Sequence, residues 1–220
     1  MSEARRAVTH HFDNAQQQRE AAELGMWVFL ATEVLFFGGL FTSYTVYRLQ
    51  YEQTFAQASH HMDLFWGTVN TAVLLCSSLT MALAVLAAQA GKRKPLVALL
   101  SATIVLGSAF LGIKFLEYYH KYQEALIPFP GWPRGGFSQF GAEAGAAKLF
   151  FYLYFAMTGL HALHMVIGVG ILATLLWIAV RGGLLAERST PVHISGLYWH
   201  FVDIVWVFLF PLLYLVGARG

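Results

Sequence analysis

The 220-residue sequence predicts an all-α, polytopic membrane bundle of five transmembrane helices. Hydrophobic residues make up 57% of the chain and charged residues only 12%, against about 45 to 50% and about 25% in an ordinary soluble domain. Five apolar runs reach the roughly 20 residues that a helix needs to cross a hydrocarbon core of about 30 Å. Backbone groups in lipid must be satisfied within the protein, so runs of this length favour helices over the shorter alternating strands of a barrel.

The chain is expected to consist of a polar tail and one bundle. Residues 1–23 are predicted to be a cytoplasmic tail, because residues 1–18 hold no apolar core of the kind that a secretory signal needs. Residues 24–217 are predicted to form a single domain without an internal repeat. We place its helices near residues 24–47, 64–89, 96–117, 149–180 and 193–216.

Lysine and arginine residues predict the orientation in a bacterial inner membrane. The tail and the loops after the second and fourth helices are richer in these residues than the opposite loops and the C-terminus. The positive-inside rule then predicts a cytoplasmic N-terminus and a C-terminus outside. A net charge of +2 gives no indication of a nucleic-acid partner. Cys76 is the single cysteine, which excludes an internal disulfide and a c-type haem attachment.

The first helix places Glu33 near the middle of the membrane. At 1.5 Å per residue, this carboxyl lies roughly 13 Å from the cytoplasmic end of the predicted helix. An ionisable group there costs roughly 2.5 to 3.5 kcal/mol on insertion scales, so we expect it to be protonated or to be reached by a cation or several donors. Two interpretations stay open: a proton-linked or subunit-contact carboxyl, and a neutral acid that is hydrogen-bonded between helices for packing specificity.

The second and third helices carry polar residues that favour packing and an interfacial cap. Asn70 and Thr71 begin a series of small and hydroxylated residues that let helices approach closely. Lys114, Glu117 and Lys121 follow at spacings that allow pairing along one helical face. The favoured interpretation is an interfacial cap with snorkelling cations and an aromatic belt. The Pro/Gly-rich loop at residues 128–147 has a covering or docking role, or it is a loose connection. Both interpretations stay open.

The fourth and fifth helices carry His161 with His164, and His200 with Asp203, each pair at i and i+3. Such histidines can bind a metal, and histidines on facing helices can hold haem. However, His164 is expected roughly 20 to 25 Å from the cytoplasmic end of its helix and His200 only about 10 Å. Two axial ligands at one level are therefore not expected, and we predict no metal site and no catalytic residue. Because carboxyls lie within the membrane segments, a proton-coupled transporter stays an alternative function. Against it, five helices do not divide into the repeated halves that are typical of transporters.

Five motifs, taken together in their order along the chain, resemble subunit III of haem-copper cytochrome c oxidases in its short five-helix form. They are residues 27–33 (WVFLATE), 70–75 (NTAVLL), 117–118 (EY), 158–164 (TGLHALH) and 198–206 (YWHFVDIVW). Each motif alone would be weak, and the resemblance runs from about Leu24 to Gly217.

The resemblance implies a subunit without a redox centre, bound beside catalytic subunit I and copper-bearing subunit II. Haem and copper lie in those partners, which reduce oxygen to water and pump protons. The family's third subunit supports proton uptake, protects the core during turnover and binds phospholipid, and other respiratory complexes are further candidate partners. The resemblance places the following residues at the family's buried polar or proton-linked positions: Glu33, Glu117, His161, His164, His200 and Asp203. Lipid-binding candidates are Trp27, Trp199 and Trp206.

Longer family members have two further helices before the position of Leu24, which form a lipid cleft with the remainder. Quinol oxidases, and some nitric oxide reductases, have similar third subunits, so both are alternatives. Glu33 and Asn70–Thr71 look more like the cytochrome c branch. We therefore expect a non-redox subunit of an aerobic cytochrome c oxidase, in which Glu33 pairs with His164 or His200.

Overall fold

The computed structural model describes residues 14–129, 135–182 and 189–215. Within these residues, five long helices are apolar enough to cross a membrane, which confirms the predicted all-α membrane bundle. These helices are α1 (Ala15–Gln50), α3 (Leu64–Gln89), α4 (Arg93–Gln123), α5 (Ala144–Val180) and α6 (Thr190–Tyr214). A short helix α2 (Glu52–Ser59) and a 3-10 helix η2 (Gly136–Glu143), neither of them predicted, lie in the connections.

Most of the helices extend beyond their predicted ends. Helix α1 begins at Ala15, so the described part of the expected tail is helical, because the Asn14 side chain accepts a hydrogen bond from the backbone N–H of Gln17 at 2.8 Å. Helix α4 continues to Gln123, two turns past the predicted end near residue 117. Its longer course determines the depth of the polar residues near that end.

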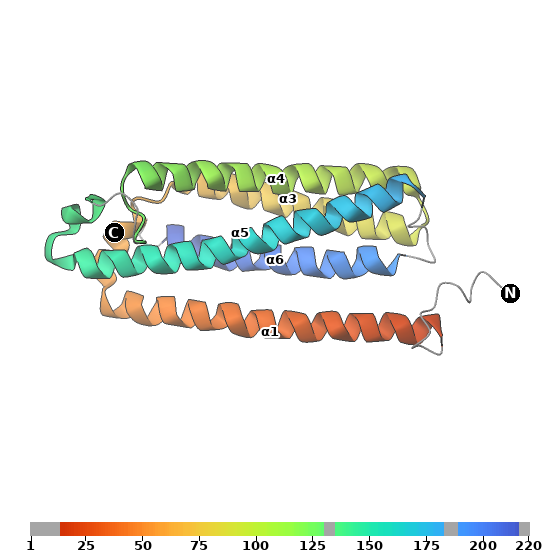
Figure 1. Ribbon diagram of the computed structural model, residues 1–220, viewed down its shortest axis with the longest axis horizontal. Helices are drawn as coiled ribbons and strands as arrows, with labels where there is room; N and C mark the ends of the chain where they lie inside the picture. Colours follow the sequence, from red (N-terminus) through yellow and green to blue (C-terminus); the bar gives the residue numbers. More distant parts are fainter. Residues whose placement is uncertain (1–13, 130–134, 183–188, 216–220) are drawn as a thin grey trace.

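Helix α6 is the centre of the bundle and α1 is its outlier (Figure 1). The most apolar window of α6 is 56% buried, whereas that of α1 is 11% buried. Helix α6 packs along α3, α5 and α1, whereas α4 packs along α3 and α5, and α1 also contacts α5. The four-helix group α3–α6 is therefore the core, to which α1 is attached along one side.

The described part of the Pro/Gly-rich loop covers one end of the bundle. Phe137 in η2 is buried, and the Thr54 hydroxyl of α2 donates a hydrogen bond to the Glu143 carboxylate. These contacts agree with the covering interpretation of the loop, whereas residues 130–134 lie outside the described part.

Trp199 of α6 fits between glycines of two neighbouring helices. A methyl group on Gly107 of α4 would lie 2.7 Å from the Cη2 atom of Trp199, and one on Gly168 of α5 would lie 3.0 Å from its Cζ3 atom. The Trp199 Nε1–H donates to the Ser77 hydroxyl at 3.1 Å, which fixes the indole against α3. Small residues at these positions thus let three helices close around one buried side chain.

Gly107→Ala is expected to destabilise the bundle by about 1 to 3 kcal/mol, because the buried indole cannot move away from the added methyl group. Gly112→Ala on the same helix is the matched control, since nothing lies within 4 Å of its added methyl group. Alanine should stabilise that position slightly through its higher helix propensity. Thermal unfolding of the two purified variants measures the difference, and equal midpoints would contradict the close fit around Trp199.

Candidate functional site

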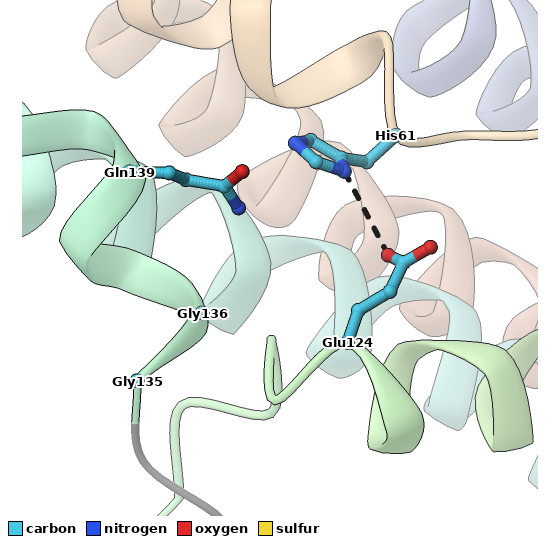
Figure 2. Close-up of a pocket in the computed structure, with 5 residues that line it drawn as sticks. All are labelled: His61, Glu124, Gly135, Gly136 and Gln139. Atoms are coloured by element: carbon cyan, nitrogen blue, oxygen red, sulfur yellow. Dashed lines mark ion pairs between the residues drawn. The ribbon is translucent and has the colours of Figure 1, made fainter.

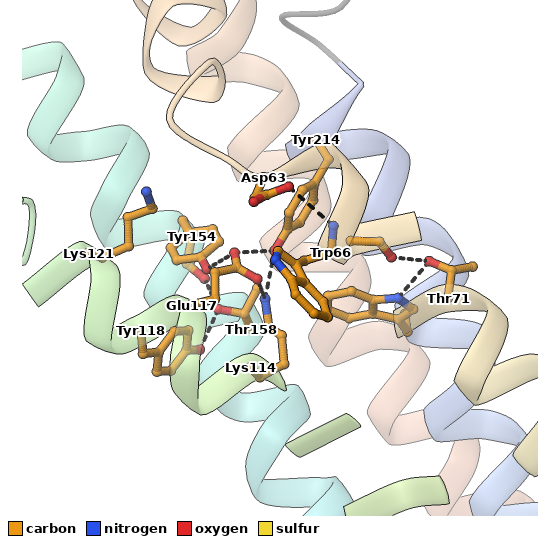
Figure 3. A network of polar contacts seen from close by, with 12 residues as sticks. Asp63, Trp66, Thr71, Lys114, Glu117, Tyr118, Lys121, Tyr154, Thr158 and Tyr214 are labelled. Carbon is orange, nitrogen blue, oxygen red and sulfur yellow. Dashed lines mark hydrogen bonds and ion pairs between the residues drawn. The ribbon is translucent and has the colours of Figure 1, made fainter. Parts of the chain in front are cut away.

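An ion pair between Lys114 and Glu117 lies buried among helices α4, α5 and α6 (Figure 3). The Lys114 Nζ atom is 3.0 Å from Glu117 Oε2, and the two side chains are 3% and 5% exposed. Tyr154 of α5 donates to Glu117 Oε1 at 2.6 Å, and Tyr214 of α6 donates to the same oxygen. Lys114 also donates to the Tyr214 hydroxyl at 2.7 Å. The network is neutral overall and joins three helices.

Aromatic rings complete the environment of the Lys114 ammonium. Its Nζ atom lies 4.8 Å from the centroid of the Trp206 ring and 5.3 Å from that of Tyr214. Tyr118, beside Lys114 on α4, shares a hydrogen bond of 2.6 Å with the Thr158 hydroxyl of α5. A cation close to several ring faces is stabilised by their quadrupoles, most strongly where water is excluded. The ammonium therefore has several partners although it lies far from water.

This geometry corrects the expectation of an interfacial cap with snorkelling cations. Helix α4 ends at Gln123, nine residues after Lys114, so the Cα atom of Lys114 lies roughly 13 Å from that end. At that depth the side chain is directed into the bundle. Lys121, the other expected partner of Glu117, instead pairs with Glu124 at 2.8 Å. The i, i+3 spacing of Lys114 and Glu117 was visible in the sequence, but Tyr154 and Tyr214 gave no signal of their participation.

Glu33 pairs with His164 between α1 and α5. The His164 Nε2 atom lies 3.3 Å from Glu33 Oε2, and the side chains are 14% and 19% exposed. The His164 Nδ1 atom lies 2.9 Å from the Leu160 carbonyl oxygen, which only accepts, so Nδ1 carries a proton. Nε2 is then the ring nitrogen that faces the Glu33 carboxyl.

His200 does not pair with Glu33, contrary to one of the two expected pairings. Its Nδ1 atom lies 2.8 Å from the Ser78 hydroxyl of α3. That hydroxyl also lies beside the Asp203 carboxyl, which is 4% exposed. Within the described residues, no hydrogen bond of standard geometry reaches either carboxyl oxygen. His200, Ser78 and Asp203 thus form a polar group between α3 and α6, which the sequence did not indicate because Ser78 was assigned to packing.

His161 faces a different part of the bundle from His164. It is fully buried, and its ring centroid lies 5.3 Å from those of Phe110 and Trp206. No described residue forms a hydrogen bond to either ring nitrogen. The four expected polar residues of α5 and α6 therefore occupy three separate environments.

The three tryptophans expected to bind lipid differ in their exposure. Trp27 of α1 is 59% exposed and lies on the outer surface of this chain. Trp199 and Trp206 are buried, and Trp206 donates to the Thr71 hydroxyl at 3.0 Å. For Trp199 and Trp206 the expectation is corrected: they pack inside the bundle because α6 is its central helix.

A polar pocket of about 370 Å³ lies at the end of the bundle where α2 and η2 are found (Figure 2). Its lining includes His61, Glu124 and Gln139, and the His61 Nδ1 atom lies 3.7 Å from Glu124 Oε2. Burial lowers the pKa of His61, and the Glu124 carboxylate opposes this shift. His61 is thus a half-buried member of this pocket, with its side chain 29% exposed.

Taken together, several of the polar residues contact partners across helix seams, as in Glu33–His164, Glu117–Tyr154 and Ser78–His200. In the described part of the chain, no three His, Cys, Asp or Glu residues are grouped as a metal site would require. The fold and these paired groups define a polytopic membrane subunit whose internal polar contacts hold helices together.

The comparison with known families gives that class a name. The model of the family "Cytochrome c oxidase subunit III" matches residues 3–124 and 141–218. The chain belongs to this family of haem-copper oxidase subunits, as the resemblance predicted.

Relatives span both branches of the family. Cytochrome bo(3) ubiquinol oxidase subunit 3 of Pseudomonas aeruginosa is 31% identical over 96% of this chain and 92% of its own length. Cytochrome c oxidase subunit 3 of Alkalihalophilus pseudofirmus is 30% identical over 98% and 96%. Quinol oxidase subunit 3 of Bacillus spizizenii is 31% identical over 90% and 88%. The chain is thus a multi-pass bacterial membrane protein and the third subunit of a cytochrome c or quinol oxidase.

Proposed function

We propose that this chain is the non-redox third subunit of a proton-pumping cytochrome c oxidase in an aerobic respiratory chain. It binds beside catalytic subunit I and copper-bearing subunit II, and its N-terminus is cytoplasmic. Family membership supports the association with catalytic subunits, and the loop charges support the orientation. The family assignment also favours an oxidase subunit over an independent transporter.

In this proposal, haem and copper belong to the partner subunits. The candidate ligands in this chain do not fit an axial pair, because His161, His164 and His200 contact three different sets of partners. His164 faces Glu33, and His200 faces Ser78. His161 lies between aromatic rings. What this chain supplies is a set of fixed, internally paired polar groups next to the catalytic subunit.

The observation that carries the proposed role is the Glu33–His164 pair. It is a half-buried polar contact between α1 and the core, and it joins a carboxyl and an imidazole on the α1–α5 seam. We infer that the pair fixes α1 and sets the protonation environment beside the catalytic subunit. Phospholipid bound along the exposed outer face of α1 is part of the same proposal.

Glu33→Gln is expected to leave the oxidase assembled and to slow proton uptake during turnover by roughly two- to fivefold. Glutamine can still hydrogen-bond to His164, but it cannot exchange the proton. A two- to fivefold slowing corresponds to an increase of about 0.4 to 1 kcal/mol in the activation free energy of proton uptake. The measurement is pH-indicator kinetics of the purified complex in vesicles, with assembly checked by its optical spectrum.

Glu23→Gln is the matched control, because Glu23 forms a second carboxylate–histidine contact of α1 in the described residues, with His193 at 3.5 Å, but its side chain is 46% exposed. It should leave proton uptake unchanged. Failure of the Glu33→Gln complex to assemble would show that the pair is structural and that the proton-tuning part of the proposal is wrong.

The electron donor separates the proposed function from its alternative. Relatives of similar identity are named cytochrome c oxidase and quinol oxidase subunits, so a quinol oxidase is the second candidate. Oxygen uptake by the purified complex from reduced cytochrome c supports the first, and uptake from quinol alone supports the second. Reduction of nitric oxide without oxygen uptake would instead indicate the reductase alternative.

A further inference from the structure

A groove of about 460 Å³ runs between α1 and α6. Its size lies within the range of small-molecule sites, about 300 to 1,000 Å³. Apolar and aromatic side chains form nearly all of its lining, including Trp27, Phe37, Phe201 and Phe208. His200 is the one ionisable side chain among the residues that line it, and the indole of Trp27 has an N–H donor. The groove thus offers an apolar channel in which only the His200 imidazole can either donate or accept a hydrogen bond.

That group lies at the depth of the membrane centre. His200 follows the first residue of α6, Thr190, by ten residues, which places it roughly 15 Å from the helix start. A hydrocarbon core is about 30 Å thick. The head group of a phospholipid lies at the membrane surface and its acyl chains form no hydrogen bonds, so a phospholipid makes no use of this imidazole.

The hydrogen bonds behind His200 can reverse direction. If the Ser78 hydroxyl donates to His200 Nδ1, the Nε2 atom carries the proton of the neutral ring and is a donor. If Nδ1–H instead donates to the Ser78 hydroxyl, Nε2 is an acceptor. The imidazole can therefore offer either a donor or an acceptor while its bond to Ser78 is kept.

We propose that this groove binds an isoprenoid quinone or quinol, whose ring oxygen hydrogen-bonds to His200. The quinone carbonyl needs a donor and the quinol hydroxyl an acceptor, and the two tautomers of His200, each bonded to Ser78, provide either at one position. The flat ring lies among the aromatic side chains, and the isoprenoid tail follows the apolar groove towards lipid. The proposal concerns binding to this chain, and holds whichever donor the partner subunits oxidise.

The test is photolabelling of the purified oxidase complex with an azido-substituted isoprenoid quinone. Digestion and mass spectrometry then locate the label on this chain, separately from any quinone site of the partners. We expect label on peptides that contain residues 27–41 or 197–208, and displacement by excess quinone but not by phospholipid or by an isoprenoid hydrocarbon without a ring. Equal displacement by all three would overturn the proposal in favour of an apolar acyl-chain groove.

Two variants and a control make the test specific. His200→Phe keeps the ring but removes the hydrogen bond, so labelling should fall roughly three- to tenfold. Ile204→Trp adds bulk to the lining of the groove and should abolish labelling. Leu163→Trp adds the same bulk at a 53% exposed position of α5 that does not line the groove, and should leave labelling unchanged. Full labelling of the His200→Phe complex, with its optical spectrum intact, would show that the imidazole does not bind the ligand.

Discussion

Lys114→Met is expected to lower the free energy of unfolding by about 3 to 5 kcal/mol, the largest effect of a single polar substitution in this chain. The variant leaves the Glu117 carboxylate, 6% exposed, without its counter-ion inside the bundle. The hydroxyls of Tyr154 and Tyr214 still reach it, but they carry no full charge. Reversible denaturation in mixed detergent micelles measures the loss.

The double variant Lys114→Met with Glu117→Gln is expected to recover most of that stability, because neither charge then remains unpaired. Lys148→Met is the matched control: its ammonium lies 5.6 Å from the Phe137 ring at an exposed position near the start of α5, and its loss should change stability by less than about 1 kcal/mol. The single variant Glu117→Gln completes the comparison. If the double variant were less stable than both Lys114→Met and Glu117→Gln, the two side chains would contribute to stability independently rather than as a pair.

Trp199→Ala is expected to destabilise the bundle by about 3 kcal/mol, near the lower end of the range for large buried side chains. Three helices close around this indole, so its removal leaves a cavity that Gly107 and Gly168 cannot fill. The lower end applies because a membrane helix gains little from the hydrophobic effect, and the loss is mainly one of packing.

Trp27→Ala removes the same side chain from the outer surface of α1, where it is 59% exposed, and should have little effect on unfolding. Thermal denaturation of the two purified variants compares buried and exposed tryptophan in one molecule. Equal losses would mean that the contact of Trp199 with the two glycines contributes nothing beyond the hydrophobicity of the indole.

The architecture was largely predictable because hydropathy and length alone determine where a chain can cross a membrane. All five crossings agree in order and approximate position with the structure. The helix ends were less predictable, since they depend on local caps such as Asn14 and on polar turns that have no hydropathy signal. The consequence was largest at Lys114, because an error of two turns at the end of α4 changed an expected surface residue into a buried one.

The partners of the candidate residues were only partly predictable. Periodicity indicates which residues share a face of one helix, but it does not indicate which helix lies opposite. His161 and His164 have the expected i, i+3 spacing, yet one faces Trp206 of α6 and the other Glu33 of α1. The pairing of Glu33 with a histidine was expected, whereas the choice of His164 over His200 required the three-dimensional arrangement of α1, α5 and α6.

The position of α1 outside the four-helix core has a consequence for synthesis of the chain. Glu33 leaves the ribosome before His164, which follows 131 residues later (from 33 to 164). At about 5 to 20 residues per second, this interval is roughly 7 to 26 s. During it the first helix is inserted without its histidine partner, so its carboxyl must enter the bilayer protonated or be shielded by the insertion machinery. The last two helices therefore complete the site at which the first one docks.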